Sequence, residues 1–135
     1  MMARKRLASA ALASLVLVAG CYQDETVNAY GAAGKTWRLV EVDQSAVDYA
    51  ATLIFPEPGR VTGKAPCNSY TGSMTAPYPW FEMGPIAATR MACPDLEAET
   101  AYFSALSEMS QSEVLGDTLI LSTEDGRTMT FKADG

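Results

Sequence analysis

The sequence contains no histidine, and it has few cysteines and few basic residues. Its 135 residues include 3 Cys and 10 Lys or Arg against 16 Asp or Glu, for a formal net charge of −6. The absence of histidine removes the commonest general base and the commonest neutral metal ligand near pH 7, which excludes Ser-His-Asp triads, Cys-His dyads and His-bearing zinc sites. The acidic balance argues against a nucleic-acid partner, because phosphates attract clustered Lys and Arg. A hydrophobic fraction of 48% is that of a chain that folds.

The N-terminal residues 1–20 combine a basic start with a short apolar run. Residues 4–6 read Arg-Lys-Arg, and the apolar run over 7–19 is too short to cross about 30 Å of hydrocarbon. The run leads into Val-Ala-Gly-Cys, which ends at Cys21 and resembles the lipobox of bacterial lipoproteins. We expect a lipoprotein signal peptide over 1–20 and a lipid anchor on Cys21. The alternatives are an ordinary secretory signal or a buried N-terminal helix.

The residues after this cysteine indicate a destination and a tether. Tyr22 follows Cys21, in place of the Asp that the enteric sorting rule associates with inner-membrane retention. We therefore expect the mature chain on the outer membrane, facing the periplasm. Residues 21–34 show no periodicity and little hydrophobicity, which predicts a lipidated N-terminus and a flexible tether. A single domain over 35–133 is expected to follow.

Short alternating segments predict an antiparallel sheet over most of this domain. Strands are expected at residues 35–42, 52–55, 60–63, 118–122 and 128–132. Residues 124–127 read Glu-Asp-Gly-Arg and predict a hairpin through a type I′ turn, after which Met129 and Phe131 face inward. The predicted fold class is α+β, mainly antiparallel β, with a curved barrel-like sheet and one α-helix at about residues 94–109.

Acidic residues gather at the start of the predicted helix. Asp95, Glu97 and Glu99 would lie at its positive N-terminal end, where anionic side chains stabilise a helix. The alternative is a metal site or a general-acid pair. The sequence favours the helix-end explanation, because no spacing singles out a carboxylate pair.

Two separated motifs resemble those of META-domain proteins, the HslJ-like family. Residues 67–72 read Cys-Asn-Ser-Tyr-Thr-Gly and look like Cys-Asn-x-(Phe/Tyr)-x-Gly, and residues 89–93 read Thr-Arg-Met-Ala-Cys and look like Thr-x-Met-x-Cys. The resemblance covers about residues 35–133. The motif residues are Cys67, Asn68, Tyr70, Gly72, Thr89, Arg90, Met91 and Cys93.

The resemblance implies a small mixed domain with a curved antiparallel sheet and one helix. The family is associated with the heat-shock response, motility and novobiocin resistance, without an agreed molecular activity. We therefore expect a lipid-anchored, non-enzymatic envelope protein that supports stress tolerance or envelope maintenance through a protein partner, with no cofactor and no metal. One alternative is a module that encloses a small ligand or lipid inside the sheet. The other is an inhibitor that plugs a periplasmic hydrolase with a loop such as 76–81.

The two motif cysteines have two explanations. The periplasm is oxidising, which favours a disulfide between Cys67 and Cys93. The alternative is two buried thiols that pack as small hydrophobic groups. A catalytic thiol is not expected, because no histidine is present to lower its pKa.

Other candidate positions also have both a structural and a functional explanation. Asn68 either bonds to nearby backbone and fixes a turn, which is the favoured explanation, or orients a ligand. Arg90 either pairs with Glu97 or Glu99, again the favoured explanation, or binds an anionic ligand.

The aromatic residues Tyr78, Trp80 and Phe81 lie in a proline-bounded loop. Aromatic side chains of this kind anchor interfaces when they are exposed, and they close a core when they are buried. The sequence does not decide between the two. Exposure of Tyr78 and Trp80 would favour the inhibitor hypothesis, and their burial would count against it.

Overall fold

The computed structural model describes residue 11 and residues 23–134. The predicted lipidation site, Cys21, lies outside these residues. A short 3-10 helix, nine strands and one α-helix make up the described part. In chain order they are η1 (Val27–Tyr30), β1 (Thr36–Val42), β2 (Ser45–Ala46), β3 (Thr52–Ile54), β4 (Gly59–Lys64), β5 (Ser69–Met74), β6 (Ala87–Ala88), α1 (Leu96–Glu108), β7 (Gln111–Leu115), β8 (Thr118–Ser122) and β9 (Thr128–Ala133).

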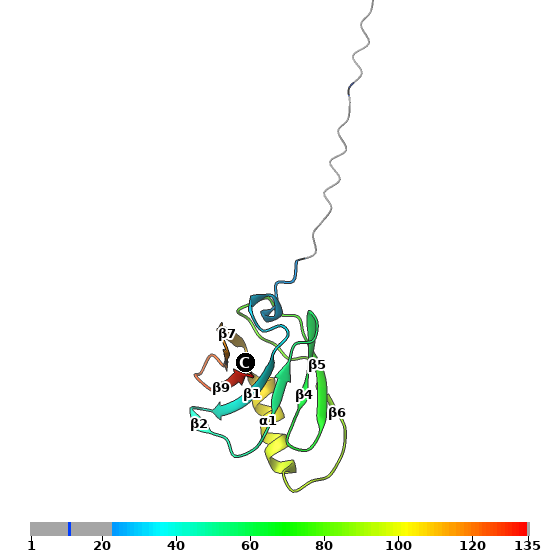
Figure 1. Ribbon diagram of the computed structural model, residues 1–135, viewed down its shortest axis with the longest axis vertical. Helices are drawn as coiled ribbons and strands as arrows, with labels where there is room; N and C mark the ends of the chain where they lie inside the picture. The colour runs from blue at the N-terminus through cyan, green and yellow to red at the C-terminus, as the bar shows by residue number, and fades with distance from the viewer. Residues whose placement is uncertain (1–10, 12–22, 135) are drawn as a thin grey trace, which may run out of the picture.

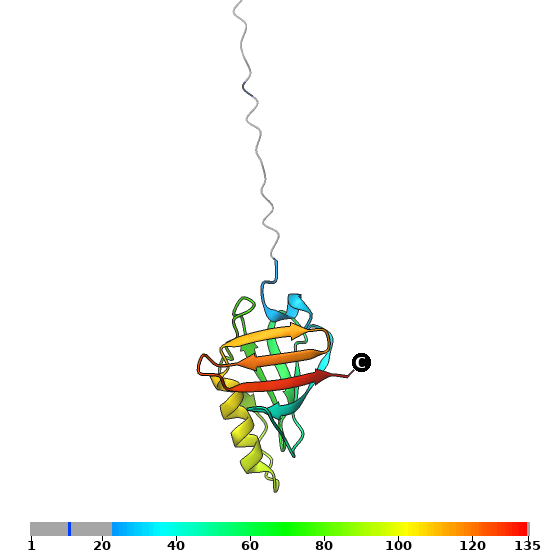
Figure 2. The ribbon, with the colours of Figure 1, turned by 90° about the vertical axis from the view of Figure 1, so that its left-hand side faces the viewer.

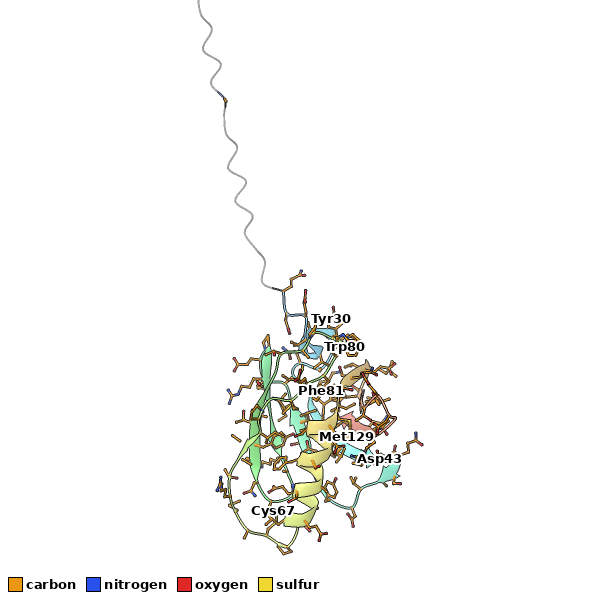
Figure 3. The ribbon with its side chains drawn as sticks, turned by 180° about the vertical axis from the view of Figure 1, so that it is seen from behind. Tyr30, Asp43, Cys67, Trp80, Phe81 and Met129 are labelled. Carbon is orange, nitrogen blue, oxygen red and sulfur yellow. A yellow bond between two sulfur atoms is a disulfide. The ribbon has the colours of Figure 1, made fainter. Side chains whose placement is uncertain are left out.

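All strand pairs are antiparallel, so the predicted fold class is confirmed. The strands follow the order β6-β5-β4-β3-β1-β9-β8-β7, and β2 pairs with β1 beside this path. The sheet curves strongly, but within the described residues β6 and β7 are its two ends and it does not close into a barrel (Figures 1 and 2). The single α-helix, α1, packs against the side where the core lies (Figure 3).

The core fills the concave side of the sheet. Along β1, Trp37 and Leu39 alternate with exposed or half-buried residues, and Met129 and Phe131 of β9 face the same core, as predicted. Helix α1 adds Tyr102 and two small or aliphatic residues of the same face. Because buried side chains occupy this interior, the structure argues against a ligand enclosed by the sheet.

The folded unit begins earlier than the predicted boundary at residue 35. Val27 and Ala32 are completely buried in the core, and the indole Nε1 of Trp37 donates a 3.0 Å hydrogen bond to Ala32 O. Helix η1 ends at Gly31, whose φ of 110° turns the chain so that both residues face inward. Most of the predicted tether over 21–34 is therefore part of the domain.

Two local predictions need adjustment. The predicted helix over 94–109 is present but spans Leu96–Glu108. The β8–β9 hairpin forms as predicted, but Gly126 is the residue of its turn with a positive φ (94°), whereas a type I′ turn needs two. Gly126 N donates to Thr123 O at 3.2 Å, and Thr123 N donates to Arg127 O at 3.0 Å, which makes a three-residue loop with one left-handed glycine.

In the part of the chain that is described, no helix combines the length and the apolar character needed to cross a membrane.

Gly63 lies where β4 passes under a tyrosine, and it provides a test of the packing. A Cβ at Gly63 would overlap the backbone oxygen of Thr52 and lie 2.7 Å from Tyr70 Oη, whereas at Gly72 it would meet the flexible end of Met83 at 2.9 Å. We predict that Gly63→Ala lowers the free energy of unfolding by about 1–3 kcal/mol, because backbone cannot move aside. Gly72→Ala is the matched control and should cost clearly less. Urea unfolding of both variants measures this, and equal losses would contradict it.

Candidate functional site

The two motifs meet at the end of the molecule where α1 begins. Residue 67 precedes β5 and residue 93 precedes α1, and a disulfide joins Cys67 to Cys93 with Cα atoms 5.8 Å apart. Figure 3 places Cys67 at the end remote from Tyr30 and Trp80. The disulfide ties the β4–β5 connection to the segment that leads into the helix.

Asn68 is the centre of a buried polar network. Its side-chain Nδ2 donates hydrogen bonds to Met91 O (3.2 Å) and Glu99 Oε2 (2.7 Å). Its Oδ1 accepts from Met91 N (2.6 Å) and Thr89 Oγ1 (3.0 Å). The side-chain amide uses both donor hydrogens and both acceptor positions on the protein itself, and the residue is 4% exposed. Asn68 is therefore a structural residue, which is the explanation that the sequence favours.

Glu99 extends from α1 into the same network. Its Oε1 accepts hydrogen bonds from the backbone nitrogens of Cys67 (3.1 Å) and Asn68 (2.7 Å), and the residue is only 6% exposed. The carboxylate thus holds the β4–β5 connection through three N–H groups, in place of a metal or a basic side chain. Within the described residues, no group of three or more His, Cys, Asp or Glu could hold a metal ion.

The expected ion pair of Arg90 does not form. Arg90 is exposed, and none of the ion pairs among the described residues involves it, Glu97 or Glu99. Glu99 instead bonds to backbone, because the turn at residues 67 and 68 presents two N–H groups that are otherwise unsatisfied. No signal in the sequence pointed to the Asn68–Glu99 contact, since its two residues are 31 positions apart.

Tyr70, the aromatic residue of the first motif, pairs with a tyrosine of α1. The hydroxyls of Tyr70 and Tyr102 lie 2.7 Å apart, and Tyr70 donates to Thr52 O at 2.6 Å. Burial raises the pKa of the Tyr70 hydroxyl far above its ordinary value of 10.0, and burial together with the neighbouring Tyr70 raises the pKa of Tyr102. Neither hydroxyl ionises near neutral pH, and the pair joins α1 to the sheet through its hydrogen bond.

Two adjacent residues of the aromatic loop differ sharply in exposure. Phe81 is 1% exposed and belongs to the core, whereas Trp80 is 52% exposed. Tyr78 is half-buried, its hydroxyl accepts from Val114 N at 3.3 Å, and its ring stacks on Tyr30 with centroids 4.5 Å apart. The inhibitor hypothesis needs both Tyr78 and Trp80 exposed, and only Trp80 is. We call Tyr30, Tyr78 and Trp80 the aromatic patch; Tyr30 and Trp80 are labelled in Figure 3.

An open groove of about 580 Å³ lies on the outer face of β3, β4, β5 and β6. Its floor is one cross-strand row, in which each residue is paired with the next: Ile54, Thr62, Thr71 and Ala87. Arg60 and Lys64 also line it, and no acidic residue does. In Figure 1 the strands β4, β5 and β6 are seen side by side on the right of the molecule. We call this the outer groove.

The outer groove is positive in an acidic protein. Lys64 forms no ion pair with any described carboxylate, and Arg60 pairs only with the exposed Glu57, at 3.3 Å. Such an exposed pair contributes little and leaves Arg60 able to take another anionic partner. The groove therefore combines an apolar floor with available positive charge.

Exchanging the two polar partners of the buried network tests its role. Asn68→Asp would place two carboxylates together, and Glu99→Gln would place two amide donors together, so each should lower the free energy of unfolding by about 1–3 kcal/mol. In the double variant, the new amide at position 99 donates to the new carboxylate at position 68, while its oxygen still accepts from the backbone. We predict that the double variant regains part of the loss, as measured by urea unfolding, because the contact between positions 68 and 99 is restored while the hydrogen bond to Met91 O is not. Glu97→Gln, at an exposed position of the same helix, is the control, and a double variant as unstable as the sum would contradict this role.

The disulfide closes a loop with a sequence separation of 26. In the chain-entropy model a loop of this size stabilises the fold by roughly 3.5 kcal/mol, because the bond restricts the unfolded chain. We predict a loss of that order in a Cys67→Ala/Cys93→Ala variant measured by urea unfolding. Non-reducing mass spectrometry of the mature protein checks the bond itself, and two free thiols would contradict it.

Comparison with known proteins supports one assignment. The META-domain family model matches residues 31–135. No curated protein matches the chain. Three solved structures share its fold. A protein from Burkholderia xenovorans determined by NMR has 24% identity and a TM-score of 0.65, over 80% of this chain and 86% of that one. A second protein determined by NMR has 23% identity and a TM-score of 0.57, over 73% of this chain and 87% of that one. A DUF4847-family protein from Bacteroides vulgatus ATCC 8482 determined by crystallography has 14% identity and a TM-score of 0.64, over 78% of this chain and 96% of that one. These likenesses show the fold alone. Since the family model covers most of the chain, the protein belongs to the META-domain family.

Proposed function

We propose that this META-domain chain is a lipid-anchored, non-enzymatic binding domain of the bacterial cell envelope. It is held on the outer membrane through Cys21, faces the periplasm, and supports envelope maintenance under stress by binding a partner protein. The observation that carries the proposal is the outer groove. It has an apolar floor, and it is lined by Arg60 and Lys64 and by no carboxylate.

The lipobox and the disulfide support the location together. The basic start, the short apolar run and Val-Ala-Gly before Cys21 are the features of a lipoprotein signal peptide. A disulfide between Cys67 and Cys93 suits the oxidising periplasm, because cytosolic thiols are kept reduced.

The motif residues support a non-enzymatic role. Asn68 and Glu99 use their polar atoms on one another and on backbone, and the hydroxyls of Tyr70 and Tyr102 are buried and un-ionised at neutral pH. A catalytic group must reach a substrate with an atom that is not already committed. Among the motif residues, Asn68 and Tyr70 therefore build the fold, and recognition is left to exposed residues.

The groove fits an acidic segment of a partner protein. The groove has a volume of about 580 Å³ and is open to solvent, so side chains on a partner's surface can reach its floor. An apolar residue of the partner would cover the row that includes Ile54 and Thr71, while a flanking carboxylate would meet Lys64. Charge complementarity of this kind raises the rate of association and excludes basic partners.

A photo-crosslinking amino acid at position 71 tests the groove in living cells. Thr71 lies on the groove floor, and Thr130 of β9 is the matched control, a mid-strand threonine of similar half-buried exposure outside the groove. We predict a recurrent crosslinked protein from position 71 and none from position 130. Lys64→Glu should reduce this product several-fold, because it places a negative charge where the partner's carboxylate binds, whereas Lys132→Glu should not. No recurrent product at position 71, or equal loss in both charge variants, would contradict the proposal.

A further inference from the structure

We propose that the aromatic patch of Tyr30, Tyr78 and Trp80 docks into the interfacial layer of the membrane that carries the anchor. This rests on the anchoring of Cys21 in the proposed function. It adds a second contact with the lipid surface and a fixed orientation of the domain. The occupant of the patch is the headgroup region of a lipid bilayer.

Only a short length of chain joins the anchor at Cys21 to the domain. Glu25 is already attached to the domain, since its carbonyl oxygen accepts a 2.7 Å hydrogen bond from Tyr78 N. Glu25 is four positions after Cys21, and at 3.3–3.6 Å per position this stretch spans at most about 14 Å. A tether that ran to residue 35 would reach roughly 50 Å. The domain can therefore not move away from a membrane that holds Cys21.

The short connection determines which side of the domain faces the membrane. The chain enters at the upper end of the molecule in Figures 2 and 3, and Tyr30 and Trp80 are labelled at the same end in Figure 3. Trp80 follows Tyr78 by two positions, and Tyr78 is the residue bonded to Glu25. The short connection from the anchor therefore enters the domain beside the aromatic patch.

The aromatic patch has the chemistry of a contact with the membrane interface. Tyr30 is 53% exposed and Trp80 is 52% exposed, so two large rings are open to water. Tryptophan and tyrosine are enriched where membrane meets water, because each combines an apolar ring with a polar group. The interfacial layer is about 5–8 Å thick on each side of the hydrocarbon, which suits rings that project from a folded surface.

The stacked rings of Tyr30 and Tyr78 and the backbone of Trp80 are also held in place before any contact. Tyr30 stacks on Tyr78 at 4.5 Å, the Tyr78 hydroxyl is bonded to Val114 N, and the backbone of Trp80 is bonded to Pro77 O at 2.8 Å. Membrane contact therefore costs little additional ordering of the loop.

Charge at this end argues for a zwitterionic rather than an anionic surface. Asp24 and Glu25 lie beside the patch, and Asp24 Oδ1 accepts from Thr26 N at 2.9 Å and from Thr26 Oγ1 at 2.6 Å. Electrostatic attraction to anionic lipid needs clustered Lys and Arg, and no Lys or Arg lines the pocket that Asp24 and Glu25 form with neighbouring described residues. The contact we propose is apolar, so salt should not weaken it.

Tryptophan fluorescence in brominated vesicles tests the docking. The full chain, acylated in cells and purified in detergent, is reconstituted into phosphatidylcholine vesicles with bromine on the acyl chains near the headgroup. Trp37 is completely buried in the core and supplies a background, which Trp80→Phe measures directly. We expect the Trp80 emission to shift to shorter wavelength and to be quenched by the bromine, and added salt to leave the quenching unchanged.

A control moves the reporter to the far end of the molecule. Leu96 is the first residue of α1 and is 45% exposed. The start of α1 lies at the end of the molecule opposite the N-terminal segment in Figure 2. In a Trp80→Phe/Leu96→Trp variant the added tryptophan should not be quenched. Flotation of the vesicles reports the anchor separately. If the protein floats but Trp80 is not quenched, or if the tryptophan added at position 96 is quenched equally, the docking alone is overturned. If the protein does not float, the anchor is overturned and the docking with it.

Discussion

The structure depends on the buried carboxylate of Glu99, which forms no ion pair with any basic side chain of the described residues. Glu99 reaches from α1 to two backbone N–H groups and one side-chain amide at residues 67 and 68, at 2.7 to 3.1 Å. Hydrogen bonds to a charged acceptor are roughly twice as strong as neutral ones, and a buried carboxylate without them is costly. The helix can therefore dock only where the turn after β4 presents those donors. The disulfide to Cys93 fixes the same turn from the other side.

The remaining contacts of α1 follow from that docking. Once the start of the helix is fixed, Tyr102 arrives one turn later beside Tyr70, and both hydroxyls converge on the carbonyl of Thr52. Tyr70 fits there only because Gly63 on the adjacent strand has no side chain. Disulfide, amide, carboxylate and tyrosine pair thus form a continuous seam between the helix and the sheet. The seam gives a structural reason for these residue types at these spacings.

The sequence predicted the elements with a strong pattern and missed those without one. Alternation identified β1, β8 and β9, because Trp37, Leu39, Met129 and Phe131 face one core. It did not identify β5 or β7, in which polar residues and glycine occupy inward positions, nor the burial of Val27 within an apparently polar segment. The motif positions were read from the sequence as well, but their partners were not. Glu99 and Tyr102 are brought to Asn68 and Tyr70 by tertiary packing alone, which no local period encodes.

The burial of Val27 has the largest consequence for function. A tether through residue 34 would let the domain reach partners tens of ångströms from the membrane, in any orientation. Val27 and Ala32 are packed into the core and Glu25 is bonded to it, so an anchor on Cys21, four positions before Glu25, would hold one end of the domain against the lipid. The seam at Cys67 then points away from the membrane, and the outer groove opens sideways. A partner would meet the groove within a domain's length of the bilayer, so a membrane protein or another lipoprotein fits it better than a freely diffusing one.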